Sequence, residues 1–228
     1  MRLDHPDPDY SSSPRARANF VLAVKLSLGL LALIWLVFLV DQLSGLRLIR
    51  FGLVPREAVG LLGLLTTPLL HYNLAHITSN TLPLLVGGTL VLYLYPHAAV
   101  RALPAIWLGA GLLAWLIARP SVHIGASGLV YGLLAFILVS GLVRRELRAV
   151  GAAGVVWFLY GSLLYGILPS GPGTSWELHA AGFLIGALAA WRLRGLDRPP
   201  LKRYEWEDEE LDPNEPSAPW REQPERWH

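Results

Sequence analysis

A serine and a histidine stand at the start of two separate apolar runs, and together they could perform nucleophilic catalysis. Ser127 lies in the segment 125–128 (Gly-Ala-Ser-Gly), and His179 is followed by Gly182 and Gly186. A serine hydroxyl is a weak nucleophile until a base removes its proton, and histidine is the usual base because its pKa lies near neutrality. The pair therefore predicts a serine-type hydrolase, provided that the fold brings the two side chains together.

The neighbours of Ser127 suit the stabilisation of an oxyanion. Gly125 and Gly128 allow the chain to turn tightly into a helix and a substrate to approach closely. A serine in the first turn of a helix also has free backbone N–H groups beside it. Taken alone the segment is weak evidence, because Ser and Gly are common where membrane helices pack together.

A third polar cluster, His71-x4-His76-x3-Asn80, begins another apolar run. His76 and Asn80 are one helical turn apart, and both side chains can donate to a developing oxyanion. A metal site is the alternative, because histidine is the commonest metal ligand. Asparagine is a poor zinc ligand, and the chain has no cysteine to complete a set. We therefore expect no metal and no other cofactor.

Glycines on two of the runs predict how the serine and the histidine meet. His179 shares a helix face with Gly182 and Gly186, and Ser127 shares one with Gly128, Tyr131 and Gly132. Two such faces can pack closely, with Tyr131 stacked beside the imidazole. Two further polar residues are expected to be bystanders: His123 as a structural residue, and Glu177 as an exposed carboxylate that faces away from the imidazole.

The composition places these residues in a membrane protein. Of the 228 residues, 53% are hydrophobic and only 16% are charged, against about 25% charged in soluble domains. The apolar residues gather into six runs near membrane-spanning length, the third of them short: 20–40, 76–95, 103–118, 127–143, 150–168 and 176–193. We therefore expect an all-α membrane protein with a six-transmembrane-helix bundle. The net charge of +2 indicates no nucleic-acid partner.

The remaining segments are predicted to be tails and connections. Residues 1–19 and 196–228 are polar and proline-containing, the second with an acidic run, so both are expected to be disordered cytoplasmic tails. The folded domain is then 20–195. Residues 41–70 are rich in leucine yet broken by glycine and proline, which predicts an interfacial, partly helical first outer loop.

Charge sets the orientation. Six spans place both termini on one side, and that side carries 15 Lys and Arg residues against 4 on the other. The positive-inside rule then puts both termini in the cytoplasm. Ser127, His179 and the His71–Asn80 cluster consequently lie at the outer ends of their spans, at similar depth. The expected location is a cell membrane, in a bacterium the inner membrane.

Three motifs, in this order and on these spans, resemble those of the rhomboid family of intramembrane serine proteases. The matching elements are His71-x4-His76-x3-Asn80, Gly125-Ala126-Ser127-Gly128 with Tyr131, and His179-Ala180-Ala181-Gly182 with Gly186. Each motif alone is weak evidence, whereas the three together are specific. The similarity covers about residues 20–195.

The resemblance implies a Ser–His dyad that requires no acid. Ser127 would attack the scissile carbonyl, with His179 as the base. The backbone at Ser127, together with His76 and Asn80, would form the oxyanion hole, and His71 would support it. Substrates would be single-span membrane proteins in the lipid bilayer, cut near the outer surface after a small residue.

The loop Pro169–Ser175 would, by the same resemblance, cap the site. One departure is that many family members have a Trp-Arg pair before the first histidine, where this chain reads Leu-Leu-Gly-Leu-Leu at 61–65. A catalytically silent relative that binds membrane proteins for quality control is the main alternative, although silent relatives usually lose the serine and histidine. A small transporter is disfavoured, because the spans carry hardly any charge and no internal repeat.

Overall fold

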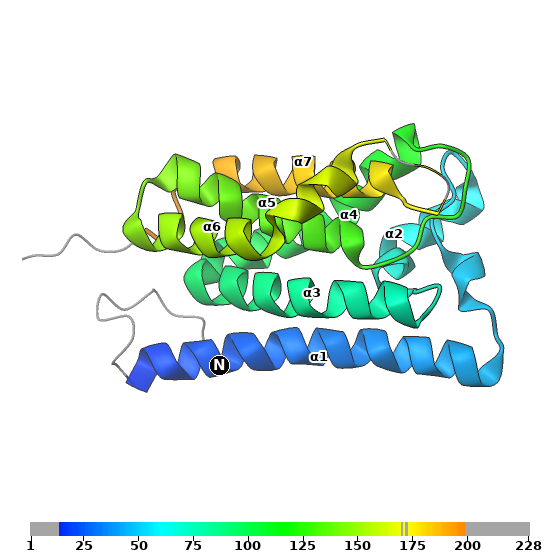
Figure 1. Ribbon diagram of the computed structural model, residues 1–228, viewed down its shortest axis with the longest axis horizontal. Coiled ribbons are helices and arrows are strands. Elements are labelled where there is room, and N and C mark those ends of the chain that lie inside the picture. The colour runs from blue at the N-terminus through cyan, green and yellow to red at the C-terminus, as the bar shows by residue number, and fades with distance from the viewer. Residues whose placement is uncertain (1–13, 170, 172, 199–228) are drawn as a thin grey trace, which may run out of the picture. The chain divides into compact units, whose positions relative to one another are not determined.

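The computed structural model describes residues 14–169, 171 and 173–198, and these residues form a helical bundle (Figure 1). Within this described part there is no strand, only an isolated antiparallel bridge between Leu53 and His123. The α-helices are α1 (Pro14–Ser44), α2 (Gly63–Thr66), α3 (Leu74–Leu94), α4 (Pro96–Ile117), α5 (Ser127–Arg144), α6 (Leu147–Tyr160) and α7 (Trp176–Arg192). Short 3-10 helices are η1 (Leu48–Phe51), η2 (Ala58–Leu62), η3 (Thr67–Leu69) and η4 (Gly161–Ile167).

Five helical segments are long and apolar enough to cross a membrane. They are α1, α3, α4, α5 and the continuous stretch of α6 and η4, Leu147–Ile167. Helix α7, the expected sixth span, has 17 residues and so measures about 25 Å. Large apolar side chains also face outward, among them Leu147 at 90% exposure and Phe158 at 87%. A surface of this kind suits lipid, and the chain is a multi-pass membrane protein.

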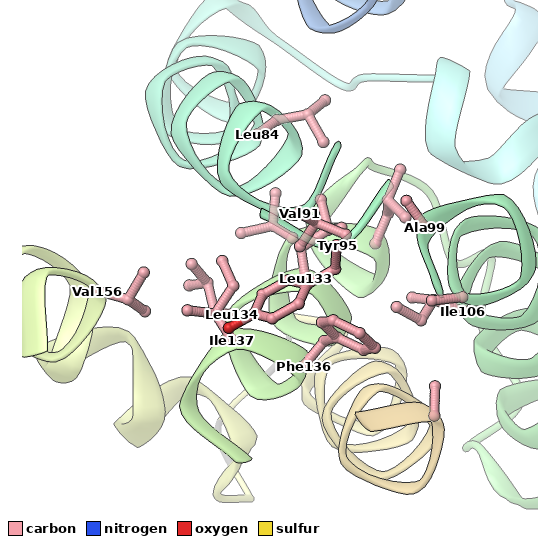
Figure 2. Close-up of a cluster of buried hydrophobic side chains, with 14 of the residues drawn as sticks. Leu84, Val91, Tyr95, Ala99, Ile106, Leu133, Leu134, Phe136, Ile137 and Val156 are labelled. Atoms are coloured by element: carbon pink, nitrogen blue, oxygen red, sulfur yellow. The ribbon is translucent and has the colours of Figure 1, made fainter. Parts of the chain in front are cut away.

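Helix α5 forms the centre of the bundle. Thirteen of its 18 residues are buried, and it packs against α3, α4, α6 and α7. Figure 2 shows side chains of α3, α4, α5 and α6 converging there, including Leu84, Ile106, Phe136 and Val156. Helix α1 lies at the edge and packs along α3 (Figure 1). The buried positions on α5, which include Ser127, are therefore fixed from several sides.

The connection 45–73 folds as a chain of short helical turns, as its mixture of leucine, glycine and proline predicts. Its backbone is held to the segment that precedes α5: Leu53 N donates to the His123 carbonyl at 3.0 Å, and Gly125 N donates to the Thr67 carbonyl at 2.9 Å. Asn73 then begins α3, because its side chain accepts from the His76 backbone N–H at 2.9 Å.

Several helix limits differ from those that hydropathy predicts. Helix α1 begins at Pro14, so residues 14–19 are helical where a disordered tail was expected. Ala16 there is buried, and helix formation by Ala and Arg extends beyond the apolar part of a span. Helix α4 begins at Pro96 and has 22 residues, so the third span is not short. Proline at a helix start and a polar first turn hide this end from a hydropathy scan.

The fold also continues past residue 195. Asp197 is buried, and its carboxylate accepts from the backbone N–H groups of His97 at 3.0 Å and Ala98 at 2.8 Å, at the start of α4. An acidic side chain stabilises a helix N-terminus in this position. The rest of the two predicted tails, residues 1–13 and 199–228, lies outside the described residues.

Candidate active site

Ser127 and His179 meet between α5 and α7. The Ser127 Oγ lies 2.9 Å from the His179 Nε2, and Ser127 is 8% exposed. The other ring nitrogen of His179, Nδ1, lies 2.9 Å from the Gly166 carbonyl oxygen. A carbonyl can only accept, so Nδ1 carries the proton and Nε2 is left to accept from the serine hydroxyl. This is the tautomer that a general base for the serine needs.

Glycines allow the two helices to approach closely enough for this contact. A Cβ on Gly182 would lie 2.0 Å from the Gly128 carbonyl oxygen, and a Cβ on Gly186 would lie 2.0 Å from the Gly132 carbonyl oxygen. Neither position can hold a side chain unless the helices separate. The structure therefore brings the two glycine-bearing faces together, with the serine and histidine at the N-terminal ends of α5 and α7.

Tyr131 fixes the plane of the imidazole. Its ring is stacked on that of His179, with centroids 4.3 Å apart and 9° between the planes. The Tyr131 hydroxyl in turn donates to the Leu163 carbonyl oxygen at 2.7 Å. Both carbonyl groups that hold this pair, those of Leu163 and Gly166, belong to η4. The imidazole is thus oriented by a stacked ring and a backbone carbonyl, without a carboxylate.

The segment before Ser127 forms a wall beside the hydroxyl. Gly125 has φ of +113°, a conformation that other residues rarely adopt, and a Cβ there would lie 2.6 Å from the His76 Nε2. The His76 ring therefore lies against this segment, close to Ser127. Because Ser127 is the first residue of α5, its backbone N–H needs no partner within the helix. This N–H belongs to the same short stretch of backbone that the His76 ring lies against.

His71 supports the segment from behind. It is buried, its Nε2 accepts from the Ala126 backbone N–H at 3.3 Å, and its ring lies edge-on to that of His76 with centroids 5.0 Å apart. Burial and, to a lesser extent, the neighbouring His76 lower the pKa of His71 to about 4, although the Leu69 backbone opposes this shift. A neutral His71 can accept from Ala126 at any ordinary pH, which keeps the segment in place.

Asn80 lies one turn below His76 and is buried, yet its amide is engaged locally. Its Nδ2 donates to the His76 carbonyl oxygen at 2.9 Å, within α3. One N–H of that amide remains for another acceptor. No group of three or more His, Cys, Asp or Glu side chains that could hold a metal ion occurs in the part of the chain that the structure describes.

Glu177 differs from its predicted role, whereas His123 was expected to be structural. Glu177 is 4% exposed and forms an ion pair with Arg119, with 3.3 Å between Oε1 and Nε, so it is not an exposed carboxylate. The reason is that the α4–α5 connection covers the start of α7, which hydropathy does not reveal. His123 is fully buried in that connection. The carbonyl groups of Leu163 and Gly166 were not predicted at all, because backbone acceptors carry no residue-type signal.

Two comparisons with known proteins name the same family. A family model described as the rhomboid domain matches residues 59–195. An uncharacterised protein of Mycobacterium tuberculosis is 41% identical over 80% of each chain, and one of Mycobacterium leprae is 37% identical over 75% of this chain and 71% of that protein. The rhomboid protease GluP of Bacillus subtilis is 33% identical over 59% of this chain and 26% of its own length.

Proposed function

Because the chain belongs to the rhomboid family, we propose that it is an intramembrane serine endopeptidase with a Ser127–His179 dyad. The observation that carries the proposal is the 2.9 Å contact between the Ser127 Oγ and the His179 Nε2, with the imidazole held as the tautomer that can accept the serine proton. The named relative GluP is a rhomboid protease, which agrees with this activity.

The chemistry proceeds in two halves. The Ser127 Oγ attacks the scissile carbonyl carbon while its proton passes to the His179 Nε2, giving a tetrahedral oxyanion. His179 then gives that proton to the leaving amine, and the peptide C–N bond breaks to leave an acyl-enzyme. Water, deprotonated by the same imidazole, hydrolyses the ester and restores Ser127. The Gly166 carbonyl stabilises the imidazolium that forms in each half.

The oxyanion is proposed to lie in the wall formed by the Ser127 N–H, His76 and Asn80. Gly125 lets the His76 ring approach, and His71 fixes the Ala126 N–H of the same segment. Losing one such donor typically costs about 10²–10³ in rate. We therefore expect His76→Ala and Asn80→Ala to leave weak cleavage, and chelators to leave the wild-type rate unchanged. Loss of activity on chelation, restored by Zn²⁺, would replace this proposal with a metal site.

The substrates are proposed to be single-span membrane proteins cut near the outer surface, with both termini of the protease in the cytoplasm. The excess of Lys and Arg on the terminal side supports this orientation. The chain has no native cysteine, so single cysteines report accessibility directly. A cysteine in either tail should resist impermeant reagents in intact cells. Labelling of a tail from outside would contradict the orientation.

The decisive experiment is cleavage of a single-span reporter in liposomes. Ser127→Ala and His179→Ala should each lower the rate by about 10⁴-fold or more, and the double variant should be no worse, because the two residues act as a unit. A fluorophosphonate probe should label the wild type and leave Ser127→Ala unlabelled. Ser140→Ala, which removes a buried serine from the same helix, is the matched control and should retain cleavage. Near-normal turnover by either folded single variant would refute the dyad.

A further inference from the structure

A buried histidine outside the dyad links the two sides of the site. His123 lies in the connection between α4 and α5, four residues before Ser127, and is fully buried. Its Nδ1 lies 3.1 Å from the Ser175 Oγ, and its Nε2 lies 3.1 Å from the Arg119 carbonyl oxygen and 3.2 Å from the Ser121 Oγ. Both ring nitrogens therefore have partners, and only the Ser175 contact leaves the connection.

The partners of the ring select one of its two tautomers. The Arg119 carbonyl can only accept, so Nε2 carries the proton and donates to it. Nδ1 is then an acceptor, and the Ser175 hydroxyl donates to it. In this tautomer both ring nitrogens are hydrogen-bonded, and the Ser175 hydroxyl points at the His123 ring.

Ser175 is the residue immediately before α7. Its carbonyl oxygen accepts from the backbone N–H groups of Leu178 at 3.0 Å and His179 at 3.1 Å. Ser175 thus joins two parts of the structure: its side chain contacts His123, and its carbonyl oxygen holds the first turn of α7, which carries His179. A shift of Ser175 would move that turn, and with it the imidazole.

His123 is equally well tied on the side of the nucleophile. Its backbone N–H and carbonyl pair with those of Leu53 at 2.8 and 3.0 Å, and two residues later Gly125 N donates to the Thr67 carbonyl. A second contact runs parallel to the first: Arg119 pairs with Glu177 and donates to the Thr174 carbonyl. Two sets of contacts, from His123 and from Arg119, therefore hold the connection that precedes Ser127 against the start of α7.

We propose that His123 is a positioning residue for this site. Its hydrogen bond with Ser175 fixes the first turn of α7 relative to the segment that carries Ser127, and so maintains the distance between the Ser127 Oγ and the His179 Nε2. His123 reaches neither of the reacting atoms, so it takes no part in proton transfer. The inference rests on the proposed function, which names that distance as the one that matters.

The expected effect is on turnover. Small misplacement of catalytic groups lowers the rate of the chemical step, by up to about 10²-fold for 1 Å, whereas the surface that holds the substrate is untouched. Losing one neutral hydrogen bond corresponds to about five- to tenfold. Ser175→Ala should therefore lower kcat by about five- to tenfold and leave KM unchanged.

Ser121→Ala is the matched control, because Ser121 contacts the same ring from within the connection and leaves the link to α7 intact. It should behave as the wild type. His123→Ala opens a cavity and can impair folding, so His123→Gln, whose amide can still meet an acceptor and a donor, is the second variant. His123→Gln should retain more turnover than His123→Ala, and adding Ser175→Ala to His123→Ala should cost nothing further.

Amide hydrogen exchange supplies a readout that does not depend on activity. In Ser175→Ala and His123→Ala, exchange at Leu178 and His179 should accelerate, while Ser121→Ala protects them like the wild type. A wild type that neither cleaves the reporter nor reacts with a fluorophosphonate would refute the proposed function. If the exchange pattern still held, His123 and Ser175 would nevertheless be shown to fix the first turn of α7. Unchanged exchange in Ser175→Ala, or a rise in KM with kcat unchanged, would overturn the positioning role.

Discussion

The α5–α7 interface and the α6–η4 segment both serve the candidate site, yet they are built differently. In α5, 13 of 18 residues are buried, and glycines bring its backbone against that of α7. In α6, four of 14 residues are buried, and η4 has none that is fully buried. The interface contributes the two side chains that would react, whereas η4 contributes only carbonyl groups.

The two regions control different aspects of the site geometry, a distance in one case and a hydrogen-bond direction in the other. Ser127 and His179 need a fixed distance, which a tight helix interface provides because neither backbone can move toward the other. The Gly166 and Leu163 carbonyls need only a direction, toward the imidazole and the Tyr131 hydroxyl. A lightly packed segment can supply direction while opening locally, since regions with few buried contacts open at low cost. Changes in the interface should therefore have larger effects than changes in η4.

The largest expected effect comes from adding a methyl group inside the interface. Gly182→Ala places a Cβ 2.0 Å from the Gly128 carbonyl oxygen, so the helices must separate. Overpacking of this kind typically costs about 1–3 kcal/mol of stability, and a displacement near 1 Å between catalytic groups costs about 10²-fold in rate. Thermal unfolding in detergent and reporter cleavage would measure the two effects.

Gly154→Ala on α6 is the matched change in the other region. Nothing lies within 4 Å of a Cβ at Gly154, so the methyl group meets no clash. Alanine also has a higher helix propensity than glycine by about 1 kcal/mol. The variant should unfold at the wild-type temperature or slightly above it and cleave normally. If Gly182→Ala and Gly154→Ala lowered thermal stability and reporter cleavage equally, the distinction between the two regions would be wrong.

The same distinction decides which parts of the fold and of the candidate site can be predicted from the sequence. The periodic apolar runs predict the helices, and the glycines three and seven residues after His179 predict the face that meets α5, because side-chain size and spacing are visible in a sequence. The site groups from η4 are backbone atoms, which every residue has. The sequence also did not predict that α4 starts at Pro96 or that Glu177 is buried. Each depends on a partner distant in the sequence, Asp197 for the first and Arg119 for the second.

An intermediate effect is expected from Gly166→Ala, within η4. A Cβ there would lie 1.9 Å from the Tyr131 hydroxyl oxygen and 3.4 Å from the His179 Nδ1. The flexible segment can yield, so the loss should be about tenfold in kcat, smaller than for Gly182→Ala. The closest contact is with the hydroxyl oxygen, and the Tyr131 Cζ lies at 3.0 Å, so Tyr131→Phe should relieve most of the clash. A double variant slower than Gly166→Ala alone would show that the methyl group disturbs the histidine instead.

Among the changes expected to slow turnover, Tyr131→Phe alone should have the smallest effect. The change keeps the ring that stacks on His179 and removes only the hydroxyl that donates to Leu163. Stacking holds the plane of the imidazole, and the Gly166 carbonyl holds its direction, so about one neutral hydrogen bond is lost, equivalent to about fivefold in rate. Tyr131→Ala removes the stacked ring as well and should lose clearly more. If the two variants were equally slow, the hydroxyl and not the ring would orient the histidine. The η4 segment would then matter as much as the α5–α7 interface, against the division drawn between them.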